Sequence, residues 1–158
     1  MSYARTLSLA VVAFVGLGLP VHAGEADQAN LQILLDTIRA NRKALVAANL
    51  QLTDTEAAGF WPLYDRYQGE LNGIQDRAAK VIEEYIAGFS TIGDAKALTL
   101  AKDWLAAESD RARVRQTYLD QFAKVLPGRK VVRFYQIENK MDAVIRFDLA
   151  AEIPVVEQ

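Results

Sequence analysis

The stretch "LTDTEAAGFW", from Leu52 to Trp61, combines a helix-start signal with two adjacent aromatic residues. Thr53 and Glu56 form a capping box, in which each side chain satisfies a free backbone donor at the start of a helix. Pro62 follows the aromatics directly, and a proline beyond the first turn removes one helical hydrogen bond. The stretch therefore predicts a helix that begins at residue 53 and bends at Pro62.

The apolar residues after this start recur in alternating steps of four and three, the heptad pattern of a helix that packs against other helices. This seam consists of Phe60, Tyr64, Tyr67, Leu71, Ile74, Ala78, Val81 and Tyr85. Helical periodicity recurs in three further segments, and no segment carries a strand signal. We therefore expect an all-α fold, an elongated four-helix hairpin or cradle with two long helices and no β-sheet. The expected helices span about 26–48, 53–88, 94–125 and 128–151.

The apolar stripes of the other three helices are less regular. The first is built on Leu31, Leu34, Ile38 and Leu45. The best seam of the third is Leu98, Ala101, Leu105, Glu108, Ala112, Arg115, Leu119 and Phe122. The fourth uses Phe134, Ile137, Met141, Val144 and Ile145, with Glu138 and Asp142 outside the stripe. Because Glu108 and Arg115 fall on apolar positions, they either form a paired layer inside the assembly or lie on a face exposed to water.

The N-terminal residues have the pattern of a secretory signal peptide. Arg5 supplies a positive charge, Leu7 to Leu19 is an apolar run, and Val21 and Ala23 occupy the small-residue positions of a cleavage site. The run is shorter than the roughly 20 residues that a membrane-spanning helix needs. The pattern predicts residues 1–23 as a signal peptide, cleavage after Ala23, residues 24–158 as a single domain in the periplasm, and no stable membrane insertion.

The composition of this mature chain argues against several classes of function. It has no cysteine, and the only histidine, His22, lies in the predicted signal. The usual zinc and copper ligands and every catalytic device that needs Cys or His are therefore missing. Because Arg5 is one of 18 Lys and Arg residues, 17 remain against 20 Asp and Glu residues, a net charge of −3 that argues against nucleic-acid binding. We expect no enzyme, no cofactor and no metal site.

A second stretch, "LPGRKVVRF" from Leu126 to Phe134, shares the skeleton of the first. In each, a Leu is followed four residues later by a charged residue and eight residues later by a Phe. The pair resembles the LTxxQ motifs of the Spy/CpxP family of periplasmic stress proteins. "LTDTE" keeps the capping chemistry with Glu in place of Gln, whereas "LPGRK" has Pro for Thr and Lys for Gln. The second helix must therefore be capped differently.

The resemblance implies that the two motifs open two helices of an elongated helical hairpin and that two protomers dimerise into a curved cradle. It implies an ATP-independent chaperone or envelope-stress adaptor that holds apolar segments of unfolded or envelope proteins. The alternative is a dedicated regulatory or structural partner of a membrane sensor or envelope protein, without general chaperone activity. A third hypothesis is a compact monomeric four-helix bundle with an unknown small ligand.

Five residues are candidates for partner binding. Phe60 and Phe134 are expected to pack in the core between the two motifs, because aromatic stripes at helical spacing are usually buried. The candidates stand outside the stripes: Trp61, Tyr135, and the basic cluster Arg129, Lys130 and Arg133. Cations are unfavourable at a helix N-terminus, so the basic cluster needs a reason. It either recognises acidic partners or lipid headgroups, or pairs with carboxylates of the second helix such as Asp65 or Glu70.

Overall fold

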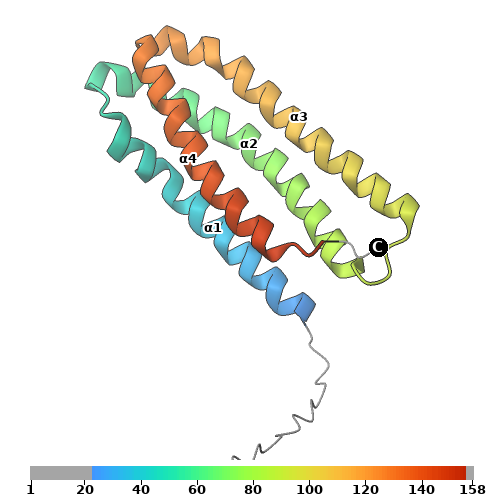
Figure 1. The fold of residues 1–158 in the computed structure, drawn as a ribbon. Helices are drawn as coiled ribbons and strands as arrows, with labels where there is room; N and C mark the ends of the chain where they lie inside the picture. The colour runs from blue at the N-terminus through green and yellow to red at the C-terminus, as the bar shows by residue number, and fades with distance from the viewer. Residues whose placement is uncertain (1–22, 156–158) are drawn as a thin grey trace, which may run out of the picture.

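The computed structural model describes residues 23–155, and this part of the chain folds into four helices without a strand (Figure 1). They are α1 (Ala23–Leu50), α2 (Asp54–Gly88), α3 (Asp94–Val125) and α4 (Gly128–Glu152). The all-α prediction is confirmed, and most helix ends lie within a few residues of the expected bounds. Residues 1–22 of the predicted signal peptide lie outside the described part.

The four helices form an elongated bundle in which consecutive helices run antiparallel (Figure 1). They are not evenly spaced, because α2 packs most closely on α3 and α1 on α4, while the two pairs approach each other less closely. The bundle is thus two antiparallel helix pairs laid face to face. This division leaves room between the pairs, where the cavity described below lies.

The start of α2 has the predicted capping box. The Thr53 hydroxyl accepts a hydrogen bond from the Glu56 N–H at 3.3 Å, and Glu56 accepts one from the Thr53 N–H at 2.8 Å. α4 begins differently, since its N-cap is Pro127, whose carbonyl accepts from the backbone N–H of Lys130. α2 continues through Pro62, which is exposed. The bend at Pro62 stays a prediction.

An aromatic cluster fills the end of the bundle where α2 and α4 begin. The rings of Phe60 and Phe134 meet edge to face with their centres 5.3 Å apart, which confirms that these two residues anchor the motifs against each other. Tyr67 and Phe122 are also fully buried in the cluster, with ring centres 5.5 Å apart. Edge-to-face aromatic pairs add stability beyond the area that they bury, so this cluster stabilises the end of the bundle where α2 and α4 begin.

The predicted seam of α3 is wrong. Its residues Leu98, Leu105 and Leu119 are exposed, whereas Leu100, Ala107, Tyr118 and Phe122 are buried. Of the predicted seam, Phe122 alone is fully buried. The inner face of α3 is interrupted by the small residue Ala107 and by the guanidinium of Arg111, so its apolar pattern does not stand out from that of the outer face. The heptad spacing of the leucines therefore predicted the outer face of α3 as the buried one.

The predicted buried faces of the other three helices also differ from the structure, at fewer positions. In α4, Glu138 and Asp142 are buried and Val144 is exposed, the reverse of the prediction. In α1, Leu45 is exposed, while three neighbours face the core: Arg42, Val46 and Leu50. The seam of α2 holds from Phe60 to Ile74, after which Ala79 and Ile82 are buried instead of Val81 and Tyr85. The α1 and α4 errors share one cause, because buried charges replace apolar residues on the inner faces.

Candidate functional site

The two motifs meet at their charged residues as well as at their aromatics. Lys130 of α4 pairs with Glu56 of α2, the fifth residue of each motif, and its Nζ also donates to the carbonyl oxygen of Gln51 at 3.0 Å. The hydrogen bond from Lys130, aided by that from the Thr53 N–H, lowers the pKa of Glu56. Lys130, a predicted partner-binding residue, thus has a structural contact that joins α4 to the start of α2.

Arg133 also has an internal partner. Its Nε donates to the carbonyl oxygen of Asn49 at 2.7 Å, close to the end of α1 at Leu50. A cation is favourable at a helix C-terminus, so the cluster that is unfavourable for α4 is favourable for α1. Arg129 is exposed.

Lys130 pairs with a carboxylate of the second helix, as one of the two alternatives predicted, but the carboxylate is Glu56 and not Asp65 or Glu70. Asp65 pairs with Lys43 of α1 at 2.6 Å, and Glu70 accepts a hydrogen bond from the Tyr118 hydroxyl at 2.7 Å. The cluster instead meets Glu56 and backbone carbonyls of the α1–α2 connection. Among the contacts described, Lys130 is the member of the cluster that pairs with a carboxylate of α2, and that carboxylate is Glu56.

The two predicted aromatic residues lie on different faces of the bundle. Trp61 is half-buried on α2 beside α1, with Lys43 Nζ 5.4 Å from its ring centre. Tyr135 is half-buried on α4 beside α3, where its hydroxyl donates to the carbonyl oxygen of Arg115 at 2.8 Å. Burial raises the pKa of Tyr135 to about 12. The two side chains therefore do not form one surface.

A shallow groove runs between α3 and α4 beside Tyr135. Ala112, Arg115 and Leu119 of α3 line it together with Tyr135. Next to it lies the outer stripe of α3, which we define as Leu98, Ala101, Leu105, Ala112 and Leu119. Its three leucines are 58%, 66% and 44% exposed. The leucines and Ala112 repeat at intervals of seven residues along one side of α3.

A buried ion network joins α1, α3 and α4 in the middle of the bundle. Arg42 donates to both oxygens of Glu138, at 3.2 and 2.8 Å, and to Asp142 at 2.7 Å. Asp142 also pairs with Arg111 and, at 3.1 Å, with Arg115. Burial alone would lower the pKa of Arg42, but the attraction of the two carboxylates outweighs it and raises that pKa. Three arginines thus share two carboxylates.

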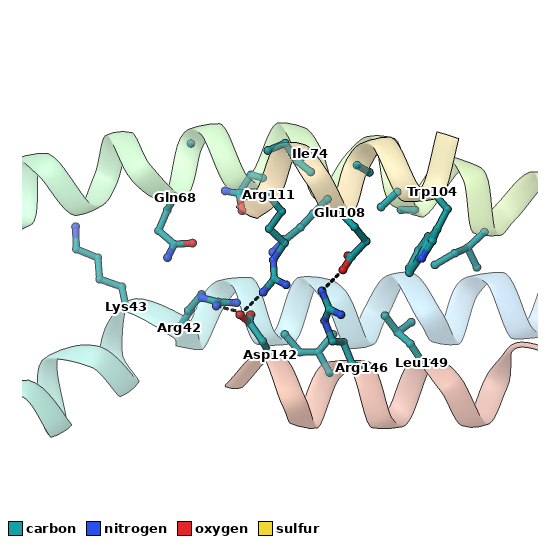
Figure 2. Close-up of a pocket in the computed structure, with 18 of the residues that line it drawn as sticks. Arg42, Lys43, Gln68, Ile74, Trp104, Glu108, Arg111, Asp142, Arg146 and Leu149 are labelled. Carbon is teal, nitrogen blue, oxygen red and sulfur yellow. Dashed lines mark hydrogen bonds and ion pairs between the residues drawn. The ribbon is translucent and has the colours of Figure 1, made fainter. Parts of the chain in front are cut away.

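A cavity of about 370 Å³ extends from this network along the bundle, between the two helix pairs (Figure 2). One half is polar and contains Arg42, Gln68 and Asp142. The other half is lined by apolar side chains, with Trp104 and Leu149 near its far end. The pair of Arg146 and Glu108, 2.6 Å apart, lies between the halves. Glu108 falls on an apolar position of the predicted α3 seam, and the structure shows it half-buried and paired with Arg146 of α4.

Two tyrosine hydroxyls in this region lack a hydrogen-bond partner among the described residues. They belong to Tyr64, which lines the cavity, and Tyr67, and both atoms are buried. Burial is the main cause that raises the pKa of each hydroxyl, so both are neutral at physiological pH. A buried hydroxyl without a partner costs about 1–3 kcal/mol, so each of these two tyrosines lowers the stability of the fold by that order.

Sequence reasoning missed the network and the cavity. Arg42 and Glu138 are 96 residues apart in the sequence, and each reads as an ordinary charge on a helix face. A signal was nevertheless present, because Glu138 and Asp142 are spaced four apart on the side of α4 that Phe134 assigns to the core. That spacing could have marked a charged inner face.

Two further observations bear on the chemistry of the described residues. Within residues 23–155, no group of three or more His, Cys, Asp or Glu side chains could hold a metal ion. None of the helices in this range is both long and apolar enough to cross a membrane.

The chain matches no protein-family model, no curated protein and no solved structure. The resemblance to the Spy/CpxP family therefore stays a prediction that rests on the two motifs. The geometry of the described residues offers two candidate sites: the outer stripe of α3 with its groove, and the cavity with its ion network.

Proposed function

We propose that this chain is an exported protein that holds apolar helical segments of other proteins on the outer stripe of α3, in the manner that the resemblance to Spy/CpxP chaperones implies. The exposure of Leu98, Leu105 and Leu119 carries the proposal. Leucines repeated at seven-residue spacing are the pattern by which one helix packs along another. The N-terminal sequence pattern supports export to the periplasm.

The shape of the stripe suits a helical occupant. Ala101 and Ala112 alternate with the leucines, and small residues let the backbone of a second helix approach closely. The groove beside the stripe adds Tyr135 and the guanidinium of Arg115 at one edge. An apolar core with aromatic and arginine residues is the usual composition of an energetically important interface.

The proposal keeps Tyr135 among the partner-binding residues and moves the centre of the surface to α3. Trp61 lies on the other side of the bundle beside Lys43, and Lys130 and Arg133 bind within the chain. Arg129, the third member of the basic cluster, is exposed and takes part in neither of these contacts.

The first experiment measures how well the purified protein suppresses aggregation of a chemically unfolded client at low salt. We expect suppression at near-stoichiometric ratios, and its loss in Leu105→Glu, which places a charge at the centre of the stripe. Val144→Glu is the matched control, because Val144 is similarly exposed, at 61%, on α4 outside the stripe. Equal suppression of aggregation by the two variants would show that the stripe does not bind the client.

The regular spacing of the stripe also favours a second candidate, a dedicated helical partner or a second copy of this chain. A dimer in sedimentation equilibrium that becomes monomeric in Leu105→Glu but not in Val144→Glu would assign the stripe to self-association. A monomer that suppresses no aggregation would favour a dedicated partner. Capture from envelope extract that is lost in Leu105→Glu would then identify it.

A further inference from the structure

We propose that the cavity between the two helix pairs binds a small amphiphile with a single anionic head group, such as a carboxylate on a short apolar chain. This site is separate from the outer stripe of α3. Its volume of about 370 Å³ lies in the range of small-molecule pockets, roughly 300–1,000 Å³. Its two halves differ in character, as such a ligand requires.

The apolar half can take the chain. Ile74, Ile82 and Leu149 line it from α2 and α4, and Trp104 closes it from α3 (Figure 2). Ala79 and Ala107 are buried on facing helices, and their small side chains leave the space that larger residues would fill. Burial of an alkyl chain here removes apolar surface from water and so stabilises the complex.

The lining of the cavity favours an anionic head over a cationic one. Four cations line it, Arg42, Lys43, Arg111 and Arg146, against three carboxylates, Asp65, Glu108 and Asp142. Glu138, which binds Arg42, is fully buried and does not line the cavity. The lining therefore carries one more positive than negative charge, which attracts an anion and repels a cation.

Donors for that head are present in the polar half. Arg111 and Arg146 each hold a single carboxylate through one terminal nitrogen, whereas a guanidinium offers five N–H donors. A carboxylate oxygen would accept hydrogen bonds from the spare N–H groups of these two arginines, and charge-assisted bonds of this kind are about twice as strong as neutral ones.

The mouth of the site is marked by an exposed pair. Lys43 of α1 and Asp65 of α2 line the cavity, and their side chains are more than half exposed and 2.6 Å apart. α1 and α2 are among the less closely packed neighbours of the bundle. A ligand can therefore enter between these two helices by breaking a surface ion pair, which contributes little to stability.

Trp104 supplies a direct probe of binding. The chain has two tryptophans, so Trp61→Phe leaves fluorescence from Trp104 alone. We would titrate this variant with decanoate below its micellar concentration, and in parallel with decanol and decyltrimethylammonium. We expect saturable binding of decanoate, at least about tenfold weaker binding of decanol, and none of the cationic amphiphile. Equal affinity for decanoate and decanol, or no saturable binding, would overturn the proposal.

Variants locate the site. Ala107→Leu and Ala79→Leu fill the apolar half from two different helices, and each should weaken decanoate binding at least about tenfold. Ala106→Leu, one residue away but exposed on α3, should leave it unchanged. Leu105→Glu, which disrupts the outer stripe, should also bind decanoate normally. Unchanged binding in both cavity-filling variants, with circular dichroism showing that they fold, would contradict the assignment.

Discussion

At the scale of single residues, the most informative contact is the pair between Glu56 and Lys130. It joins the two motif stretches, because the cation of Lys130 neutralises the carboxylate of Glu56 at the matching position. The sequence predicted that the second cap must differ, and Pro127 confirms it. It could not predict the pair itself, since the two residues are 74 positions apart.

The lowered pKa of Glu56 makes a prediction about pH. A carboxyl whose pKa is lower in the folded than in the unfolded state stabilises the fold above its usual value of 4.5, and this contribution is lost as pH falls toward the folded pKa. Glu56→Gln keeps the cap acceptor but removes the charge. We expect a lower melting temperature than the parent at pH 7 and a much smaller difference at about pH 3.5.

The control for this prediction is the partner. In a Lys130→Met background, Glu56→Gln should have a much smaller effect at pH 7, because the charge has lost its principal hydrogen-bond donor. A difference of equal size at both pH values, or in both backgrounds, would show that the charge of Glu56 is irrelevant to stability.

A second prediction at this scale concerns Asp142, which holds three arginines while 7% exposed. Asp142→Asn leaves those cations with one carboxylate, so we expect the free energy of unfolding to fall by about 3–5 kcal/mol. Asp110→Asn is the matched control, because Asp110 also binds two arginines, Arg77 and Arg113, but at the surface. Its effect should be about 0–1 kcal/mol. Urea titrations giving equal losses would argue against the buried network.

At the scale of helices, the bounds and most of the buried face of α2 were predictable, and the buried face of α3 was not. Thr53 with its capping box, and the Pro-Gly pair at 127–128, are local signals, and both mark helix starts that the structure has. The face of α3 depends on its neighbours instead. Its inner side tolerates Ala107 and Arg111 because a cavity and an ion network lie there. Neither feature can be read from the segment alone.

Two glycines of α2 test the packing of this helix. Alanine at Gly73 would meet no neighbouring atom within 4 Å, so Gly73→Ala should stabilise the protein by about 0.5–1 kcal/mol through helix propensity. At Gly59 the added carbon would lie 3.2 Å from Val125 Cγ1. Gly59→Ala should therefore gain less or lose stability in thermal unfolding. A larger gain at Gly59 would mean that α2 and α3 are less closely packed there.

Pro62 tests the shape of the same helix. It lies inside α2 at an exposed position, and a proline in a helix interior is less favourable than alanine by about 3 kcal/mol. Pro62→Ala should raise the melting temperature and, if the predicted bend is present, straighten α2. Small-angle scattering measures the change in maximum dimension. An unchanged melting temperature and shape would contradict the bend.

At the scale of the whole molecule, the all-α architecture followed from the sequence, and its division into two helix pairs did not. Arg42 of α1 is buried with Glu138 and Asp142 of α4, and these charges hold that pair together. Asp142 also binds Arg111 and Arg115 of α3, so the same network links the two pairs. The aromatic cluster links them again at one end, where Phe122 of α3 contacts Phe134 of α4.

The pairing of α1 with α4 also has a consequence for folding kinetics. Arg77 and Asp110, which join α2 to α3, are 33 residues apart, whereas Arg42 and Glu138 are 96 apart. Contacts between distant segments cost more loop-closure entropy and tend to form later. We therefore expect α2 and α3 to fold as a hairpin nucleus, onto which α1 and α4 dock last.

Stopped-flow measurements can separate these steps. Arg42→Met should speed unfolding with little effect on the refolding rate, because its contacts form after the transition state. Phe122→Leu, in the aromatic cluster shared by α2 and α3, should slow refolding. The opposite pattern would place the docking of α1 and α4 before the nucleus. On the expected order, the ion network sets the lifetime of the folded state, and the hairpin sets how quickly that state is reached.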